Sequence, residues 1–255
     1  MAGQSLIFAD DFDALRIDQT KWIVERRAGN DQGTAKAELQ YYSPEAVVLD
    51  GGILHVTAER RVTFDPKTRV TLQYTSGRLR TRQTFLYGRF EFRARLPRGR
   101  GFWPALWLRT PPQLPLDGEI DVIEGYGSHP NLIQSTLHPW TNGHEPRQFC
   151  AWLLTMPVPD SPRFHRPDCE RMEGVIALPH DLASDFHIYA MEWTPNQITW
   201  SLDGKPYFVV REDIPHVPMV VIIQNPISAH WDGMPDHTTV FPQSLDIDYV
   251  HIYAQ

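Results

Sequence analysis

The chain has 255 residues, 42% of them hydrophobic and 22% charged, and its 24 Lys and Arg against 31 Asp and Glu give a formal net charge of −7. No apolar run approaches the roughly 18 to 20 residues that span a bilayer, and the first residues lack a basic segment followed by an apolar core, which excludes a membrane protein and an intact signal peptide. The acidic balance and the scattered Lys and Arg argue against a nucleic-acid partner, because phosphate binding depends on clustered cations.

Two features of the composition are unusual. The 22 prolines and 16 glycines are too many for long helices. The 8 tryptophans, 9 tyrosines and 12 phenylalanines are many for this length, and aromatic rings can bind flat apolar surfaces. No low-complexity linker or internal repeat divides the sequence, so we expect one domain over residues 1–255.

Short segments that alternate apolar and polar residues recur along the chain and predict half-buried strands. In chain order they are residues 52–58, 89–96, 188–193, 197–202 and 248–253. Turn residues separate them, and Asp203-Gly204 between two alternating runs predicts a two-residue hairpin turn. Many short strands with frequent turns indicate an all-β fold, an antiparallel sandwich or jelly roll.

The most unusual strand is Asp117–Gly125, with the sequence DGEIDVIEG. A regular strand places Glu119 and Asp121 on one face and Glu124 on the opposite, apolar face, where an unpaired carboxylate is costly to bury. A β-bulge around Val122-Ile123 would return Glu124 to the face of the other two acids, and bulges are frequent beside active sites. We therefore predict a bulge at this point.

On a bulged strand the two glutamates are about four residue steps apart, or ~13 Å between Cα atoms. Side chains that lean inward from a concave sheet could bring the carboxyl groups to about 5–5.5 Å, the separation found in retaining glycosidases. Asp121 between them could hold one glutamate ionised while the other stays protonated. The spacing alone equally allows an acidic edge strand that is solvated or binds a cation.

The E-x-D-x-x-E pattern from Glu119 to Glu124 resembles the signature of glycoside hydrolase family 16 in its laminarinase-like (endo-β-1,3-glucanase) form. Further segments resemble blocks of that family in the same order, over nearly the whole chain: residues 8–12, 38–42, 87–91, 101–107, 135–138, 186–193 and 241–250. The resemblance implies a concanavalin A-like β-jelly roll of two curved antiparallel sheets. Its concave face would form an open cleft for a β-linked polysaccharide.

The resemblance also implies a role for each acid. Glu119 matches the nucleophile, Glu124 the general acid/base, and Asp121 the residue that hydrogen-bonds to the nucleophile and tunes it. In the implied retaining reaction, Glu124 protonates the leaving oxygen while Glu119 attacks the anomeric carbon, and water then releases the glycosyl-enzyme. No cofactor or metal takes part in that chemistry.

Six further residues match family positions that bind substrate: Trp103, Trp107, Trp231, His138, Arg78 and Glu38. The three indole rings would pack against the apolar C–H faces of sugars. The resemblance places the histidine near the acid/base and the +1 sugar, and the arginine and the glutamate in the cleft.

The residues alone leave plainer interpretations open. Trp103 and Trp107 could be core tryptophans, and Arg78 and Glu38 could be solvated surface residues. Trp193 and Trp200 lie in alternating strands and are expected in the core.

A structural calcium site on the convex side recurs in the family, and its ligands match Asp11, Gly51 and Asp248. Hard oxygen ligands suit calcium, which would tie the two chain ends together. The resemblance further implies a polysaccharide as the partner of a monomeric protein. A secreted or periplasmic location is expected because such substrates are extracellular, with Met1 to Gln4 in place of a removed signal peptide.

Two segments depart from the laminarinase pattern. Residues 224–233, QNPISAHWDG, carry bulkier side chains where the family usually has a glycine-rich loop, so the glycone end is expected to be narrowed or recontoured. Residues from about 139 to 180 are expected to form an extended loop that walls the aglycone side of the cleft. Cys150 and Cys169 could pin that loop with a disulfide or remain free thiols.

These patterns together predict a retaining endo-glycosidase that acts on a β-linked polysaccharide, with laminarin-like β-1,3-glucan as the first expectation. A depolymerase of a decorated bacterial exopolysaccharide or of a galactan is an alternative, which the altered loops would suit. A non-catalytic, lectin-like carbohydrate-binding module is another, because a fold alone does not determine function. The three intact acids favour the enzyme, since a module without activity would be expected to have lost one of them.

Overall fold

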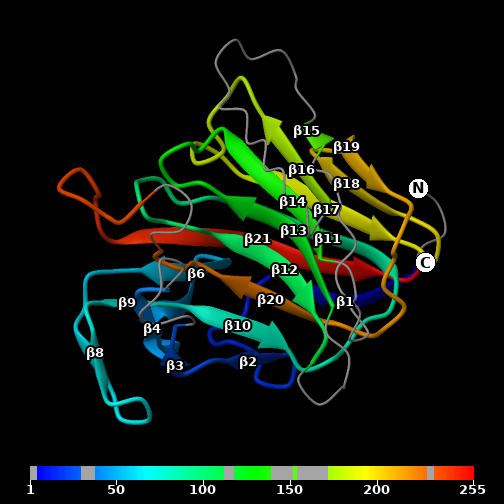
Figure 1. The fold of residues 1–255 in the computed structure, drawn as a ribbon. Coiled ribbons are helices and arrows are strands. Elements are labelled where there is room, and N and C mark those ends of the chain that lie inside the picture. Colours follow the sequence, from blue (N-terminus) through cyan, green and yellow to red (C-terminus); the bar gives the residue numbers. More distant parts are fainter. Residues whose placement is uncertain (1–4, 30–37, 112–117, 139–151, 154–171, 229–232) are drawn as a thin grey trace.

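The structure is a computed structural model that describes residues 5–29, 38–111, 118–138, 152–153, 172–228 and 233–255. Its described part is built almost entirely of strands, arranged in two large sheets that pack face to face (Figure 1). This arrangement confirms the predicted all-β sandwich.

The first large sheet has eight strands. Across the sheet they are β19 (Lys205–Val210), β18 (Ile198–Leu202), β17 (His187–Trp193), β11 (Gly88–Arg95), β21 (Gln243–Tyr253), β6 (Ile53–Ala58) and β5 (Val47–Asp50), with β1 (Leu6–Asp10) also paired to β21. Neighbouring strands are antiparallel. The first and last strands of the chain therefore lie side by side in this sheet.

The second large sheet also has eight strands. Across the sheet they are β15 (Trp152–Leu153), β16 (Met172–Ala177), β14 (Leu132–His138), β13 (Glu119–Gly125), β12 (Ala105–Arg109), β20 (Val220–Gln224), β10 (Arg78–Thr81) and β2 (Trp22–Val24). All neighbours are antiparallel except β15 and β16, which run parallel.

Smaller elements complete the described fold. They are a three-stranded sheet of β3 (Arg27–Ala28), β4 (Gln40–Tyr42) and β9 (Tyr74–Ser76), a hairpin of β7 (Thr63–Asp65) and β8 (Val70–Leu72), and the 3-10 turn η1 (Pro44–Ala46). Among the described residues, no helix is long and apolar enough to cross a membrane.

The main hydrophobic core lies between the two large sheets. Strand β11 shows how the sequence specifies it, because Phe90, Phe92 and Ala94 are fully buried while the charged residues between them are only half-buried. The predicted core positions of Trp193 and Trp200 are confirmed, since both are completely buried. Their indole N–H groups donate to backbone carbonyls, so neither ring carries an unmet polar group into the core.

The strands predicted from alternation are confirmed as β6, β11, β17, β18 and β21. The hairpin turn at Asp203-Gly204 is also confirmed, with φ of 49° and 75°, the left-handed values that a two-residue turn between β18 and β19 requires.

The extended loop predicted over about 139–180 is wrong for part of that range. Residues 172–177 form β16, which pairs with residues 132–137 of β14, and residues 152–153 form β15. The edge of β14 would otherwise expose unpaired backbone groups, and the apolar run Val175-Ile176-Ala177 supplies a strand to cover it. Residues 139–151 and 154–171, with both cysteines, lie outside the described residues.

Candidate active site

The predicted bulge in β13 is confirmed. Against β14 the register shifts between Asp121 and Glu124, and the same extra residue appears against β12. Ile120, Val122 and Ile123 all belong to the core between the sheets. The acids of this strand therefore share the other face, which is the face of the second sheet directed away from the core.

A buried serine on the neighbouring strand holds the bulge. Ser135 is fully buried, and its Oγ donates to the backbone carbonyl of Val122 at 2.7 Å. The same hydroxyl lies 2.6 Å from the hydroxyl of Tyr207 on β19, in the opposite sheet. Burial raises the pKa of Tyr207, so its hydroxyl stays neutral and available for this contact. The bulge is thus fixed by hydrogen bonds that reach across the core.

Glu119, Asp121 and His138 form a close group at one end of the bulged strand. His138 lies directly opposite Glu119 in the β13–β14 ladder. Its Nε2 is 3.1 Å from Oδ2 of Asp121 and 3.4 Å from Oε1 of Glu119. An ionised carboxylate can only accept, so a proton on this ring nitrogen satisfies both contacts.

This geometry corrects one expectation. The sequence analysis placed His138 near Glu124, but the antiparallel register puts Gln134 opposite Glu124 and carries His138 to the other end of the site. The single candidate metal group among the described residues is this same trio, whose ligand atoms lie within 4.8 Å of one another.

Glu124 accepts a hydrogen bond from a tryptophan. Its carboxylate accepts a hydrogen bond of 3.0 Å from Nε1 of Trp103, a half-buried residue that precedes β12. Glu124 itself is 8% exposed, and Asp121 is 3% exposed, so both carboxylates lie in a largely dehydrated setting. Trp103 therefore lies beside β13 with its N–H directed at a carboxylate, and its predicted contact with sugar stays a prediction.

The strand register places the other predicted residues in rows across the exposed face of this sheet. One row runs from Glu124 to Ala105, Gln224 and Arg78 on successive strands. The next row contains Asp121 and Trp107. Trp107 packs with Ala105, Val220 and Ile222 in a cluster separate from the main core.

Arg78 and Glu38 are not solvated surface residues, because they are only 5% and 4% exposed. The guanidinium of Arg78 lies 4.9 Å from the ring centroid of Trp107 and donates to Oε1 of Gln224. Glu38 bridges to Ser228 through its backbone. Gln224 lies in the same row of the sheet as Glu124 and Arg78, and the sequence analysis did not assign it, because only its place beside Arg78 reveals it.

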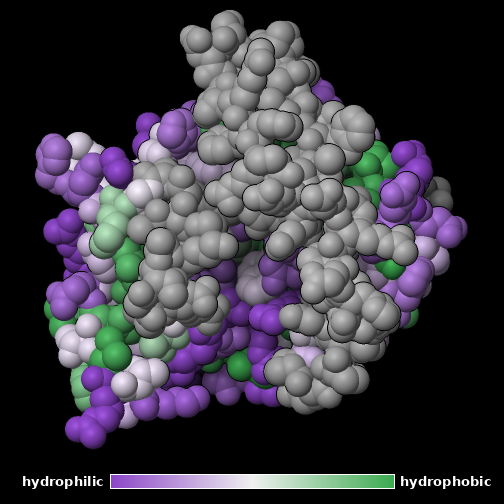
Figure 2. All heavy atoms as spheres, in the orientation of Figure 1, coloured by the Kyte–Doolittle hydropathy of each residue, from purple (hydrophilic) through white to green (hydrophobic). Residues whose placement is uncertain are grey.

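Figure 2 shows this side of the molecule with a hollow at its centre, where the visible described atoms are mainly hydrophilic. The predicted platform Trp231 lies outside the described residues, as do Ala229 and His230 of the departing loop. Ser228 is described and is buried. The binding roles of these residues stay predictions.

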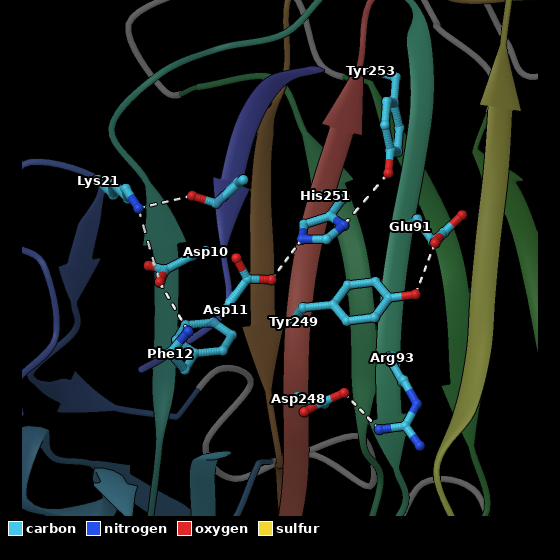
Figure 3. A network of polar contacts seen from close by, with 11 residues as sticks. Asp10, Asp11, Phe12, Lys21, Glu91, Arg93, Asp248, Tyr249, His251 and Tyr253 are labelled. Atoms are coloured by element: carbon cyan, nitrogen blue, oxygen red, sulfur yellow. Dashed lines mark hydrogen bonds and ion pairs between the residues drawn. The ribbon is translucent and has the colours of Figure 1, made fainter. Parts of the chain in front are cut away.

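The predicted calcium ligands lie on the opposite side of the molecule, where the structure gives the two carboxylates separate partners (Figure 3). Oδ2 of Asp248 accepts from Nη1 of Arg93 at 2.5 Å, and Oδ1 of Asp11 lies 2.8 Å from Nε2 of His251. In Figure 3 these side chains point to different neighbours and not toward one another. Gly51 lies in the turn between β5 and β6 with φ of 59°. Arg93 supplies the positive charge that calcium would bring to Asp248, so the described side chains do not fit an ion held between them.

Known proteins are similar to this chain in sequence and in fold. Residues 41–251 match the profile of Glycosyl hydrolases family 16. The β-glucanase of Rhodothermus marinus is 32% identical, with an alignment that covers 97% of this chain and 84% of that protein. Glucan endo-1,3-β-glucosidase A1 of Niallia circulans is 28% identical over 100% of this chain, which spans only 38% of that longer protein.

A solved structure of a similar protein has the same fold. The catalytic domain of an endo-1,3-β-glucanase (laminarinase) from Thermotoga petrophila RKU-1 superposes with a TM-score of 0.81 at 28% identity, covering 99% of this chain and 98% of that one. The likeness confirms the predicted β-jelly roll, and the bulged acidic strand lies inside the matched region. The chain belongs to glycosyl hydrolase family 16.

Proposed function

We propose that this protein is a retaining endo-glycosidase that hydrolyses β-1,3-glucan. The observation that carries the proposal is the bulged strand β13, which brings Glu119, Asp121 and Glu124 to one face of the sheet, beside Trp103 and His138. Two carboxyl groups flanking one site are what a double displacement at an anomeric carbon requires.

In the first step, the carboxylate of Glu119 attacks the anomeric carbon while the bond to the leaving oxygen breaks. Glu124 gives its proton to that oxygen, so the departing chain leaves as a neutral alcohol. In the second step, the carboxylate of Glu124 takes a proton from water, whose oxygen attacks the anomeric carbon and releases Glu119. The configuration at the anomeric carbon is retained.

The neighbours of each glutamate suit these roles. His138 and Asp121 share a proton-bearing contact beside Glu119, which orients a nucleophile that must stay ionised. The indole of Trp103 fixes one oxygen of Glu124, so the other can face the leaving group. Positioning of this kind lowers the entropy that the reaction must lose.

A neutral glucan suits the described cleft better than an anionic polymer. Arg78, a cation on this face of the sheet, pairs with Glu25 at 3.0 Å, so its charge is matched within the protein. Nε1 of Trp107 is buried and has no hydrogen-bond partner among the described residues. A sugar hydroxyl could accept from it, because buried polar groups are normally paired. The β-1,3 linkage itself is supported by the relatives named as endo-1,3-β-glucanases.

The deciding experiment measures reducing ends released from a panel of laminarin, mixed-linkage glucan, galactan and a decorated exopolysaccharide. We expect the wild type to cleave laminarin fastest and Glu119→Gln to lose activity by at least about a thousandfold. Glu91→Gln, on the outer face of the first sheet, is the matched control and should retain activity. Faster cleavage of the galactan or the exopolysaccharide would replace the substrate assignment. Glucan binding without any hydrolysis would support the lectin-like module instead.

The stereochemical course is a separate test. Proton NMR of the first product should show the β-anomer, which later mutarotates. An α-anomer formed first would contradict the double displacement.

We also propose a secreted or periplasmic monomer, because a long glucan reaches the cleft only outside the cell membrane. Fractionation of the native host and light scattering of the purified protein test the two statements.

A further inference from the structure

Glu25 is a half-buried acid that neither the sequence pattern nor the catalytic scheme uses. It directly follows β2, and its backbone N–H donates to the carbonyl of Arg78 at 2.9 Å. Its side chain is only 15% exposed. Glu25 thus extends the pairing of β2 with β10 at the edge of the second sheet.

Three arginines surround this one carboxylate. Oε2 of Glu25 lies 3.0 Å from Nε of Arg78 and 2.9 Å from Nε of Arg27, and Oε1 lies 3.7 Å from Nε of Arg80. Burial acts to raise the pKa of Glu25, but Arg78 and Arg27 outweigh it and hold the pKa below its usual range. Glu25 is therefore ionised at neutral pH and anchors the guanidinium groups around it.

Arg78 links Glu25 to residues on the cleft face of the sheet. Its side chain is only 6% exposed, and its guanidinium lies over the ring of Trp107 at 4.9 Å and over that of Tyr42 at 5.8 Å. It also donates to Oε1 of Gln224. A planar guanidinium held by a carboxylate can stack and hydrogen-bond at the same time, which fixes both neighbours.

The strand register shows how far Arg78 lies from the two glutamates. Arg78 pairs with Gln224, Gln224 with Ala105, and Ala105 with Glu124, so Arg78 is three strands from the acid/base. At about 4.8 Å between strands, the Cα atoms of Arg78 and Glu124 are ~14 Å apart, while Trp107 lies only one strand from β13, opposite Asp121. The contacts of Arg78 therefore extend from beside Asp121 toward sugars that bind but do not react.

We propose that Glu25 is a positioning residue for substrate binding, which holds Arg78 so that the ring of Trp107 and the amide of Gln224 are preset to receive a sugar of the glucan. The inference rests on the proposed function. Because the interaction is present in both the bound ground state and the transition state, its loss should raise KM and leave kcat nearly unchanged.

The test compares Glu25→Gln with wild type and with the control Glu91→Gln, whose carboxylate pairs with Arg89 on the first sheet at 2.7 Å. We expect KM for laminarin to rise on the order of tenfold in Glu25→Gln, with kcat within about twofold. The control should change neither constant. Affinity for laminarin measured in the inactive Glu119→Gln background should fall by the same factor when Glu25→Gln is added.

A second variant keeps the inference testable if Glu25→Gln folds poorly. In Glu25→Asp the charge remains, and we expect KM to return most of the way to the wild-type value. Adding Glu25→Gln to Arg78→Lys should raise KM little further, because both changes disable the same unit. A wild-type KM in Glu25→Gln, or a lowered Tm with KM unchanged, would overturn the inference alone. Absence of laminarin hydrolysis by the wild type would overturn the proposed function and this inference together.

Discussion

The hydroxyl of Ser135 is predicted to hold the bulge that brings Glu124 to the active face. Replacing Ser135 by Ala removes two hydrogen bonds, one to the carbonyl of Val122 at 2.7 Å and one shared with Tyr207 at 2.6 Å. Ala fits the site, since it only lacks the oxygen. The change therefore tests the hydrogen bonds and not the packing.

The expected cost follows from burial. Ser135 is 0% exposed, so the carbonyl and the tyrosine hydroxyl that lose it gain no water in its place. Leaving a buried polar group unpaired costs about 1–3 kcal/mol, and relaxation around the small cavity makes about 2–4 kcal/mol reasonable for both together. For a chain of this size, we expect the Tm to fall by about 5–15 °C.

Activity should fall more than the loss of stability explains. Well below both Tm values, kcat of Ser135→Ala should drop about tenfold or more, because a loosened bulge misplaces Glu124. Tyr207→Phe should show a smaller loss of the same kind, and the double variant should be less than additive. Ser244→Ala is the control, since Ser244 makes a comparable contact of 2.7 Å with Thr57 on the other sheet. Wild-type Tm and kcat in Ser135→Ala would refute this account of the bulge.

Three further predictions follow from single contacts. Trp103→Phe keeps a flat ring but removes the hydrogen-bond donor to Glu124. In steady-state assays we therefore expect kcat to fall about tenfold and KM to stay within about twofold of the wild-type value. An unchanged kcat would show that Trp103 does not position the acid/base. Because the pKa of Glu25 is lowered in the fold, its stabilisation is present above its unfolded pKa of about 4.3 and is lost as the pH falls through the folded value. The Tm difference between wild type and Glu25→Gln, measured by calorimetry, should therefore be widest near neutral pH and close in acid; a difference that grows in acid would contradict the ion pair. Because Arg93 already neutralises Asp248, EGTA and added calcium should each move the Tm by no more than about 1 °C, and a fall of several degrees in EGTA would restore the predicted calcium site.

Much of the fold could be predicted because its signals are local. The alternation of apolar and charged residues over 89–96 predicts a strand with one face in the core. The pair Asp203-Gly204 predicts a turn that needs positive φ. Strand β16 could not be predicted in this way. Its residues lie in a proline-rich stretch, and they form a strand because the edge of β14, more than thirty residues away in the sequence, offers backbone partners.

The same distinction applies to the site. The bulge was predictable because, on a regular strand, Glu124 would point into the core and be buried without a partner. The place of His138 was not, because it depends on the register of two strands joined by a hairpin. The burial of Arg78 could not be predicted either, because a charged residue is normally expected at the surface. Its charge is matched by Glu25, which lies 53 positions away in the sequence.

The regular strand β12 sets the spacing of the three acids on β13. Ala105, Trp107 and Arg109, at regular steps of two, pair with Glu124, Asp121 and Glu119. Six residues of β13, from Glu119 to Glu124, are thus paired with five of β12, and the extra residue, Val122, turns inward to the core, where its carbonyl accepts from Ser135. The two glutamates are consequently set by a regular neighbouring strand, about four steps or ~13 Å apart at their Cα atoms. Any change that lets the bulge migrate along β13 would reverse the direction of Glu124 without altering any of the three acids, which is why loss of the Ser135 hydroxyl behind the strand should lower activity although it touches none of them.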